Sequence, residues 1–251
     1  MKIIATDYDG TLNHGGIDEK KKQAISNWRR KGNLFGVVSG RGITSLLDII
    51  DGKEFEYDYL IASNGGVIYD NKNNLLFENH LDGQIAVGLV EDLISWGCPF
   101  ANIDTDVAIM VQAQEKRNPD EYTLADMPRG FKVFNQVSTW LPTIEETLDV
   151  IKKIEDKYSG ILTPLQNGCC IDIVPFGVNK SSGIYALLKA FDAKPENVIT
   201  IGDNVNDYHM IRDFRSYAMA NGVDSIKELA DYITESVTDL IEKEIKKRKL
   251  S

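Results

Sequence analysis

The chain has 251 residues, a formal net charge of −10, and a composition that is 43% hydrophobic and 26% charged. This length and composition indicate a folded protein with room for more than one hydrophobic core, and they exclude a disordered chain. The acidic balance excludes a typical nucleic-acid-binding protein, which needs a basic face to neutralise phosphates.

The first part of the chain alternates predicted strands and helices. The run "KIIAT" is short, apolar and rich in β-branched residues, which predicts a buried strand over residues 2–6. A helix is predicted over residues 18–31, with Asp18 as its N-cap and Gly32 after its last turn. The segments that follow predict a strand, a short helix, and a strand leading into a hairpin whose turn is "NKNN": "LFGVVSG", "SLLDIID" and "YLIASNGGVIYDNKNNLLFENHL".

The same alternation returns after Lys180. Helix, strand, helix, strand and helix are predicted for "GIYALLKAF", "NVITIGD", "VNDYHMIRDF", "SYAMA" and "IKELA". Alternating strands and helices are typical of a parallel sheet, so both ends of the chain are predicted to build one Rossmann-like α/β core. Between them, "IAVGLVEDLISWG" and "IEETLDVIKKIEDKY" predict helices, and "DVAIMVQ" and "CCIDIVPF" predict strands. We therefore expect a discontinuous core, residues 1–81 and 178–251, and an inserted α+β cap domain, residues 82–177.

Polar residues follow several predicted strands at their carboxyl ends, where open parallel sheets bind ligands. These residues, with a lysine that precedes a predicted helix, are Asp7, Asp9, Ser39, Gly40, Asp203, Asn206, Asp207 and Lys180. Clustered carboxylates repel one another, and hard oxygen ligands without nearby histidine or cysteine favour Mg²⁺. A hydroxyl, loop amides and an ammonium favour a phosphate group. The combination predicts phosphoryl transfer.

The motifs that carry these residues resemble a known family. "DYDGT", "VVSGR", the pair Asn179–Lys180 and "GDNVND" resemble, in order and spacing, the four motifs of the haloacid dehalogenase-like phosphohydrolases. The position of the insertion, with "SNGGVIYD" and "IDIVPFGVNK", resembles the Cof-type branch with its large α/β cap. The resemblance implies a Mg²⁺-dependent phosphatase that hydrolyses small phosphate monoesters through an aspartyl-phosphate.

The same resemblance implies a role for each residue. Asp7 corresponds to the nucleophile, and Asp9 to the acid and base. Mg²⁺ is expected to be held by Asp7, the main-chain carbonyl of Asp9, and Asp203, with Asp207 acting directly or through water. Ser39, Gly40 and Lys180 are expected to bind the phosphoryl group, and Asn206 to contact the substrate or order the waters of the metal.

Three alternatives stay open from the sequence. A phosphomutase would use the same residues, a phospho-acceptor signalling module would share the strand-end aspartate, and a non-catalytic protein would only bind a phosphorylated ligand. Asp9 and the large insertion count against the signalling module, and the presence of Asp7 and Lys180 counts against the binding protein. The expected partner is a small phosphorylated metabolite such as a sugar phosphate, a nucleotide, pyridoxal phosphate or flavin mononucleotide. No oligomeric state is predicted.

Several other features receive a structural interpretation. Asp104 and Asp106 repeat the D-x-D spacing within the insertion, and they are interpreted as solvent-facing acids before a strand and not as a second metal site. Arg41 suits either a phosphate contact or a helix cap. Candidates for lining a pocket from the insertion are Trp96, Asn102, Trp140 and Gln166.

Cysteine usage and hydropathy bear on the compartment. The three cysteines are odd in number, and two of them are adjacent, which suits reduced thiols. No stretch approaches the roughly 18 uncharged apolar residues of a membrane helix, and the start of the chain lacks a signal-peptide pattern. These features predict a cytoplasmic protein that does not contact a membrane.

Overall fold

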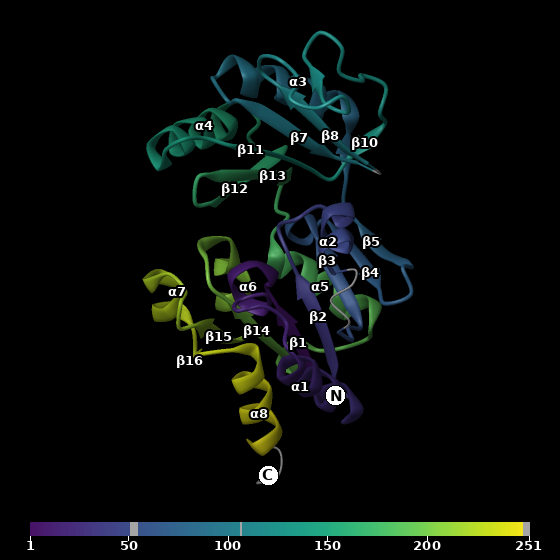
Figure 1. Ribbon diagram of the computed structural model, residues 1–251, viewed down its shortest axis with the longest axis vertical. Helices are drawn as coiled ribbons and strands as arrows, with labels where there is room; N and C mark the ends of the chain where they lie inside the picture. Colours follow the sequence, from purple (N-terminus) through teal and green to yellow (C-terminus); the bar gives the residue numbers. More distant parts are fainter. Residues whose placement is uncertain (51–54, 106, 248–251) are drawn as a thin grey trace.

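Figure 1 shows the computed structural model, which describes residues 1–50, 55–105 and 107–247. Within these residues the larger sheet has eight strands in the order β16-β15-β14-β1-β2-β3-β4-β5. The hairpin of β4 (Val67–Asp70) and β5 (Leu75–Glu78) forms an antiparallel edge. The other strands are parallel: β1 (Ile3–Thr6), β2 (Leu34–Val38), β3 (Tyr59–Ala62), β14 (Val198–Gly202), β15 (Arg215–Met219) and β16 (Tyr232–Thr234).

Helices cover both faces of this sheet because its strands are apolar on both sides. Ile4 belongs to one hydrophobic cluster, and its neighbours Ile3 and Ala5 belong to another, as expected for side chains that alternate across a strand. The first cluster includes residues of α1 (Glu19–Arg30), α2 (Ile43–Ile50) and α8 (Val237–Lys247). The second includes residues of α5 (Lys180–Ala190), α6 (Tyr208–Asp213) and α7 (Asp224–Leu229). The predicted α/β core is confirmed.

Local signals placed most of these elements correctly. The Asp18 carboxylate accepts a hydrogen bond from the Lys21 amide at 2.8 Å, and it caps α1 as predicted. The hairpin turn lies at residues 71–74, between β4 and β5. The helix predicted over residues 205–214 is wrong at its start, where a 3-10 turn (Val205–Asp207) precedes α6. There, the side chain of Asp207 binds main-chain amides of the loop before it.

The inserted segment builds a second sheet above the ends of the core strands (Figure 1). Its described strands follow the order β12-β13-β11-β7-β8-β9. The helices α3 (Gly83–Ser95) and α4 (Ile144–Lys157) contribute to a hydrophobic cluster with one face of this sheet. The strands are β7 (Phe100–Asp104), β8 (Ala108–Gln112), β9 (Tyr122–Thr123), β11 (Gln136–Trp140), β12 (Leu162–Asn167) and β13 (Cys170–Pro175). The short pair β6 (Leu81–Asp82) and β10 (Val133–Phe134) lies beside it.

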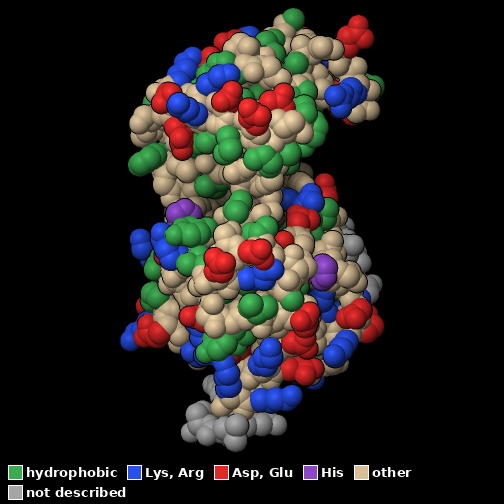
Figure 2. Space-filling view, turned by 90° about the vertical axis from the view of Figure 1, so that its left-hand side faces the viewer, with side chains coloured by type: hydrophobic (Ala, Val, Ile, Leu, Met, Phe, Trp, Pro, Cys, Tyr) green, Lys and Arg blue, Asp and Glu red, His purple; other side chains and the backbone are tan. Residues whose placement is uncertain are grey.

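The molecule therefore has two lobes, and Figure 2 shows the constriction between them. Side chains alternate between the two faces of the second sheet, and Ile103, Val137 and Ile171 lie on the face that packs against the helices. The opposite face carries polar side chains and looks toward the core. No helix in the described part of the chain is long and apolar enough to cross a membrane. All three cysteines are free.

Candidate active site

The residues predicted from the strand ends meet at one cavity. It has a volume of about 530 Å³ and lies between the carboxyl ends of the core strands and the polar face of the second sheet. The predicted residues that line it are Asp7, Asp9, Ser39, Gly40, Asp203 and Asn206. The remaining two, Lys180 and Asp207, are fully buried beside Asp7. The tertiary structure thus brings together residues that are up to 200 positions apart in the sequence.

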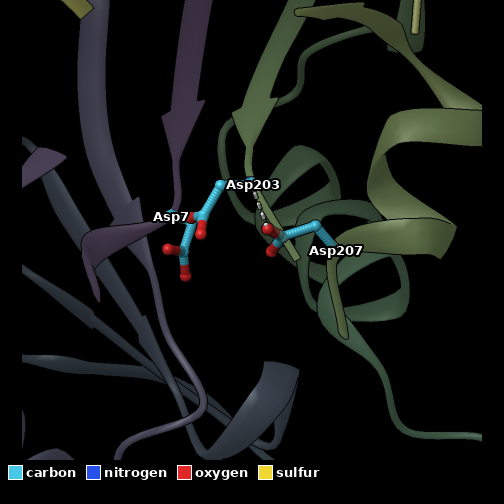
Figure 3. A group of neighbouring side chains, drawn as sticks. All are labelled: Asp7, Asp203 and Asp207. Carbon is cyan, nitrogen blue, oxygen red and sulfur yellow. Dashed lines mark hydrogen bonds between the residues drawn. The ribbon is translucent and has the colours of Figure 1, made fainter. Parts of the chain in front are cut away.

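Two of the acids come from neighbouring strands. In the register of β1 and β14, Thr6 lies beside Ile201. Asp7 follows Thr6 directly and Asp203 comes two residues after Ile201, so both acids leave the sheet at the same edge. The Asp7 amide donates to the Ile201 carbonyl at 2.9 Å, which extends the pairing to the acid itself. Figure 3 shows these two carboxylates side by side, with Asp207 across from them. Oxygen atoms of all three acids lie within 4.8 Å of one another.

Lys180 connects two of these acids. Its Nζ lies 2.5 Å from Asp7 Oδ1 and 2.5 Å from Asp207 Oδ1. The other oxygen of Asp207 accepts hydrogen bonds from the main-chain amides of Asp203, at 2.8 Å, and Asn204, at 3.1 Å. Both oxygens of Asp207 therefore already have donors. This arrangement makes Asp207 an anchor for the loop and the lysine, and it favours an indirect role at any metal.

Charge is unbalanced in this cluster. Burial raises the pKa of Asp7 well above its usual value, the Lys180 ammonium opposes that rise, and Asp207 adds to it. Burial would lower the pKa of Lys180, but the carboxylates of Asp207 and Asp7 outweigh burial and raise it, so the lysine is charged. Burial also raises the pKa of Asp203. One buried ammonium faces three carboxyl groups, so the cluster lacks positive charge. A divalent cation that prefers oxygen ligands would supply it.

A tight turn positions Asp9 after Asp7. Residues Tyr8–Leu12 form a helical turn in which Gly10 has a φ of +79°, a left-handed conformation that favours glycine. A Cβ at position 10 would lie 2.4 Å from Asp203 Oδ2, so only glycine leaves room for that carboxylate. Thr11 Oγ1 donates to the other oxygen of Asp203 at 2.6 Å. The motif "DGT" thus builds part of the cluster as well as the turn.

Arg41 binds Asp9 directly. Its Nε donates to Asp9 Oδ2 at 2.7 Å, and its Nη2 donates to Asp9 Oδ1 at 3.0 Å. The Arg41 amide also donates to the hydroxyl of the buried Ser39 at 3.1 Å. The sequence left two interpretations of Arg41 open, and neither anticipated this ion pair. Nothing in the local pattern pointed to it, since the two residues are 32 positions apart.

The wall of the cavity opposite the strand ends comes from the second sheet. Its lining residues are Asn102, Asp104, Ala108, Gln136, Ser138, Asn167, Cys170 and Asp172. Hydrogen bonds join this wall to the core: Gln136 Nε2 donates to the Gly40 carbonyl at 2.8 Å, and Asn64 Nδ2 donates to Asp172 Oδ2 at 2.9 Å. Asn64 and Asp172 are 108 positions apart.

The interpretation of Asp104 as a solvent-facing acid is wrong. The residue is the last of β7 and lies on the same face as Asn102, so its side chain points to the cavity and not to open solvent. Burial raises the pKa of Asp104 to about 7, and the nearby Asp172 adds to the rise. Burial also raises the pKa of Asp172 to about 6, with the Asn64 hydrogen bond opposing it. Asp106 lies outside the described residues.

Only one of the four residues considered from the insertion lines this cavity. Asn102 does, whereas Trp96 and Trp140 line a separate hollow with α4 residues. Gln166 is absent from the described lining of the cavity, and its neighbour Asn167 is present there. The alternation of "CIDIV" carried the signal for Asp172, because a polar residue between buried ones marks the opposite face of a strand.

Fold and site together define a hydrolase with an α/β core and a second sheet above its site. More specifically, the chain belongs to the haloacid dehalogenase-like hydrolase family, whose sequence model matches residues 4–240. That match includes both sheets and every predicted site residue.

Individual relatives agree with this assignment. The chain is 25% identical over 240 residues to the 5-amino-6-(5-phospho-D-ribitylamino)uracil phosphatase YcsE of Bacillus subtilis (strain 168), covering 94% of this chain and 90% of that protein. The solved structure of a haloacid dehalogenase-like hydrolase from B. subtilis superposes with a TM-score of 0.83 at 19% identity, covering 96% of this chain and 99% of that chain. A haloacid dehalogenase-like hydrolase from Bacteroides thetaiotaomicron has a TM-score of 0.76 at 21% identity, with coverages of 96% and 98%. These structures share the fold.

Proposed function

We propose that the protein is a Mg²⁺-dependent phosphatase that hydrolyses small phosphate monoesters. One observation carries the proposal: the buried Lys180 bridges Asp7 and Asp207 at the strand ends, and Asp7 and the neighbouring Asp203 line the cavity. Such a cluster suits the attack of a carboxylate on a phosphoryl group, because charge at the reacting atoms is met by fixed groups. Family membership and a relative that is named as a phosphatase support the same activity.

In the proposed reaction, Asp7 is the nucleophile. One of its carboxylate oxygens forms a bond to phosphorus while the bond from phosphorus to the leaving oxygen breaks, and Asp9 gives its proton to that oxygen. A water molecule then loses a proton to Asp9 and attacks the aspartyl-phosphate, which releases phosphate and restores Asp7. The Lys180 ammonium neutralises charge at Asp7 and the phosphoryl group throughout.

Asp7 and Asp203 would hold the metal, because each has a carboxylate oxygen that makes no hydrogen bond to Lys180 or Thr11. The Asp9 carbonyl would be a further ligand, and Asp207 holds the loop that carries Asp203. Mg²⁺ would supply charge neutralisation for the phosphoryl oxygens. Ser39, Gly40 and Asn206 at the rim of the cavity are proposed to contact the substrate.

The ion pair with Arg41 adds a step to this scheme. Both oxygens of Asp9 accept hydrogen bonds from Arg41, so Asp9 is ionised in this pair. It must leave Arg41 and take up a proton from solvent before it delivers that proton to a leaving oxygen. An incoming phosphate dianion offers the guanidinium a replacement partner. Substrate binding is therefore proposed to free Asp9.

Residues 82–177 are proposed to act as the cap over residues 1–81 and 178–251. The polar wall of the second sheet lines the cavity opposite the strand ends. With substrate bound, this wall is proposed to limit the entry of water, which would strengthen electrostatic interactions inside. The leaving group of the substrate would lie against this wall.

The direct test is phosphate release from a panel of small phosphate monoesters. We expect release in the presence of MgCl₂ and its loss when the metal is removed with EDTA, with activity restored by added Mg²⁺. Release that is unaffected by EDTA would contradict the metal assignment. If no monoester releases phosphate in either condition, the phosphatase proposal is wrong.

A second prediction concerns the turn at Gly10. Gly10→Ala forces an L side chain into a left-handed conformation, at a cost of about 1–2 kcal/mol, and brings its Cβ against Asp203. Gly15 has a similar φ of +70° but no neighbour within 4 Å, so Gly15→Ala is a matched control for the backbone strain alone. We expect both variants to lose free energy of unfolding, with the larger loss in Gly10→Ala because the clash with Asp203 adds to the strain. A fall in kcat of about 10²-fold is expected only in Gly10→Ala. Equal kcat values for the two variants would show that the close approach to Asp203 does not matter.

A further inference from the structure

Among the described residues, the wall that residues 82–177 give to the cavity has two carboxyl groups, Asp104 and Asp172, and no lysine or arginine. Residues that pair across neighbouring strands of the second sheet lie side by side on the same face. Ser138 pairs with both Asn102 and Asp172, and Gln136 pairs with Asp104. Two carboxyl groups and several amide and hydroxyl groups therefore face the cavity from one surface. None of the lysines and arginines of residues 82–177 lines the cavity in the described part of the chain.

The core supplies little charge to balance this wall. Arg41 is the cation among the described lining residues, and its Nε and Nη2 both donate to Asp9. Lys180 is bound between Asp7 and Asp207 below the cavity. The phosphoryl group to be transferred would lie near Arg41, Lys180 and the proposed metal. The part of the substrate under the cap would meet no cation among the described residues.

Asp104 is the acid with the most freedom to bind a ligand. Asp172 already accepts from Asn64 at 2.9 Å and from Gln136 at 3.4 Å, one bond to each oxygen. Asp104 accepts from Asn102 at 3.2 Å through Oδ1. Its whole carboxyl group lies against the core loop at Gly42, where a Cβ would be 2.5 Å from Oδ1 and 2.8 Å from Oδ2. A carboxylate can accept about four hydrogen bonds, so Asp104 retains capacity toward the cavity.

We propose that Asp104, supported by Asp172, selects substrates by the charge of the leaving group: amine-bearing and neutral hydroxyl-rich groups are accepted, and a second anionic group is rejected. This inference rests on the proposed phosphatase function. Hydroxyl and ammonium groups donate hydrogen bonds to the wall, whereas a second phosphate or a carboxylate meets like charge without a partner. At distances on the order of 10 Å and an effective dielectric constant of about 20, Coulomb's law gives roughly tenfold in affinity per unit charge.

The test is a charge series on one sugar scaffold. Dissociation constants are measured by isothermal titration calorimetry in MgCl₂ with the Asp7→Asn protein, so that ligands are not consumed. The pH is set above the raised pKa values of Asp104 and Asp172, so that both carboxyl groups are ionised. The ligands are glucosamine 6-phosphate, glucose 6-phosphate and glucose 1,6-bisphosphate, whose leaving groups run from positive through neutral to strongly negative. We expect affinity to fall at each step, with the bisphosphate at least about tenfold weaker than the monophosphate. In either orientation the bisphosphate presents one phosphate to the wall.

A second substitution assigns the effect. Asp104→Asn, made in the Asp7→Asn protein, is expected to reduce the differences in affinity among the three ligands. It should raise the affinity for the bisphosphate, because it removes the carboxyl group and keeps the side-chain size. Asp156→Asn changes an exposed acid on α4 and is the control for the change in net charge. It should leave the three dissociation constants unchanged. A merely structural role for Asp104 would shift all three ligands together and would overturn the proposal.

The remaining outcomes are also decisive. Equal affinities for the three ligands, or the tightest binding for the bisphosphate, would overturn the charge selection. Phosphate release by the wild-type enzyme separates this failure from failure of the proposed function. If the wild-type enzyme releases phosphate but affinity does not fall with negative charge, only the proposed charge selection is refuted. If affinity falls as expected but no phosphate is released, only the catalytic proposal is refuted. Absence of both binding and release would refute both.

Discussion

Replacing Asp7 with asparagine should abolish phosphate release while the protein remains folded. The amide is nearly the size of the carboxylate, but it is not a nucleophile, and loss of a nucleophile typically costs several orders of magnitude. We expect kcat to fall by at least about 10⁴-fold. The measurement is steady-state phosphate release on the best ester from the panel, with Asp149→Asn, an exposed acid on α4, as the control.

Stability gives this prediction its second readout. Because burial raises the pKa of Asp7, the folded state binds a proton at Asp7 more tightly than the unfolded state does. The ionised carboxylate therefore reduces the free energy of unfolding as the pH rises above the usual pKa of an aspartate. The neutral amide of the Asp7→Asn variant does not carry this penalty, and Lys180 keeps its contact with Asp207. The variant should unfold at the same or a higher denaturant concentration at pH 7. Wild-type turnover in this variant would refute the mechanism.

Replacing Lys180 with methionine should damage both stability and activity. Lys180 is fully buried and bridges two carboxylates that are also buried, so its loss leaves Asp7 and Asp207 facing each other without a counter-charge. Removing one partner of a buried ion pair costs about 3–5 kcal/mol in the free energy of unfolding. Urea denaturation should report this loss, and phosphate release should fall with it.

The control for this variant lies on the same helix. Lys189→Met removes an exposed lysine from the last turn of α5, and it should change the free energy of unfolding by less than about 0.5 kcal/mol. Added Mg²⁺ should recover part of the stability of Lys180→Met, because a cation bound between Asp7 and Asp203 supplies some of the missing charge. Equal stability of Lys180→Met and Lys189→Met would show that the bridge contributes nothing to the fold.

Much of the catalytic side of the cavity follows from the sequence alone. A strand such as "KIIAT" is recognised from its own composition, and the residues that follow it in the sequence lie at its carboxyl end. In a parallel sheet those ends share one edge, so Asp7, Ser39 and Asp203 could be expected together without knowledge of the strand order. Local rules also placed the Asp18 cap and the turn at residues 71–74. These features depend on neighbouring residues, and the sequence is sufficient for them.

The cap wall and the partners of the acids required the tertiary structure. Asp104 was misread because its local pattern fits a solvent-facing strand end equally well, and only the docking of the second sheet places it over Gly42. The pair of Arg41 with Asp9 and the bond from Asn64 to Asp172 join segments 32 and 108 positions apart. Such contacts depend on strand register and on how two separately folded faces meet, and a one-residue change of register would turn every side chain of a strand to its other face. The set of residues that gathers at the strand ends was therefore determined by the sequence itself, and the polar wall opposite them was decided by packing between the lobes.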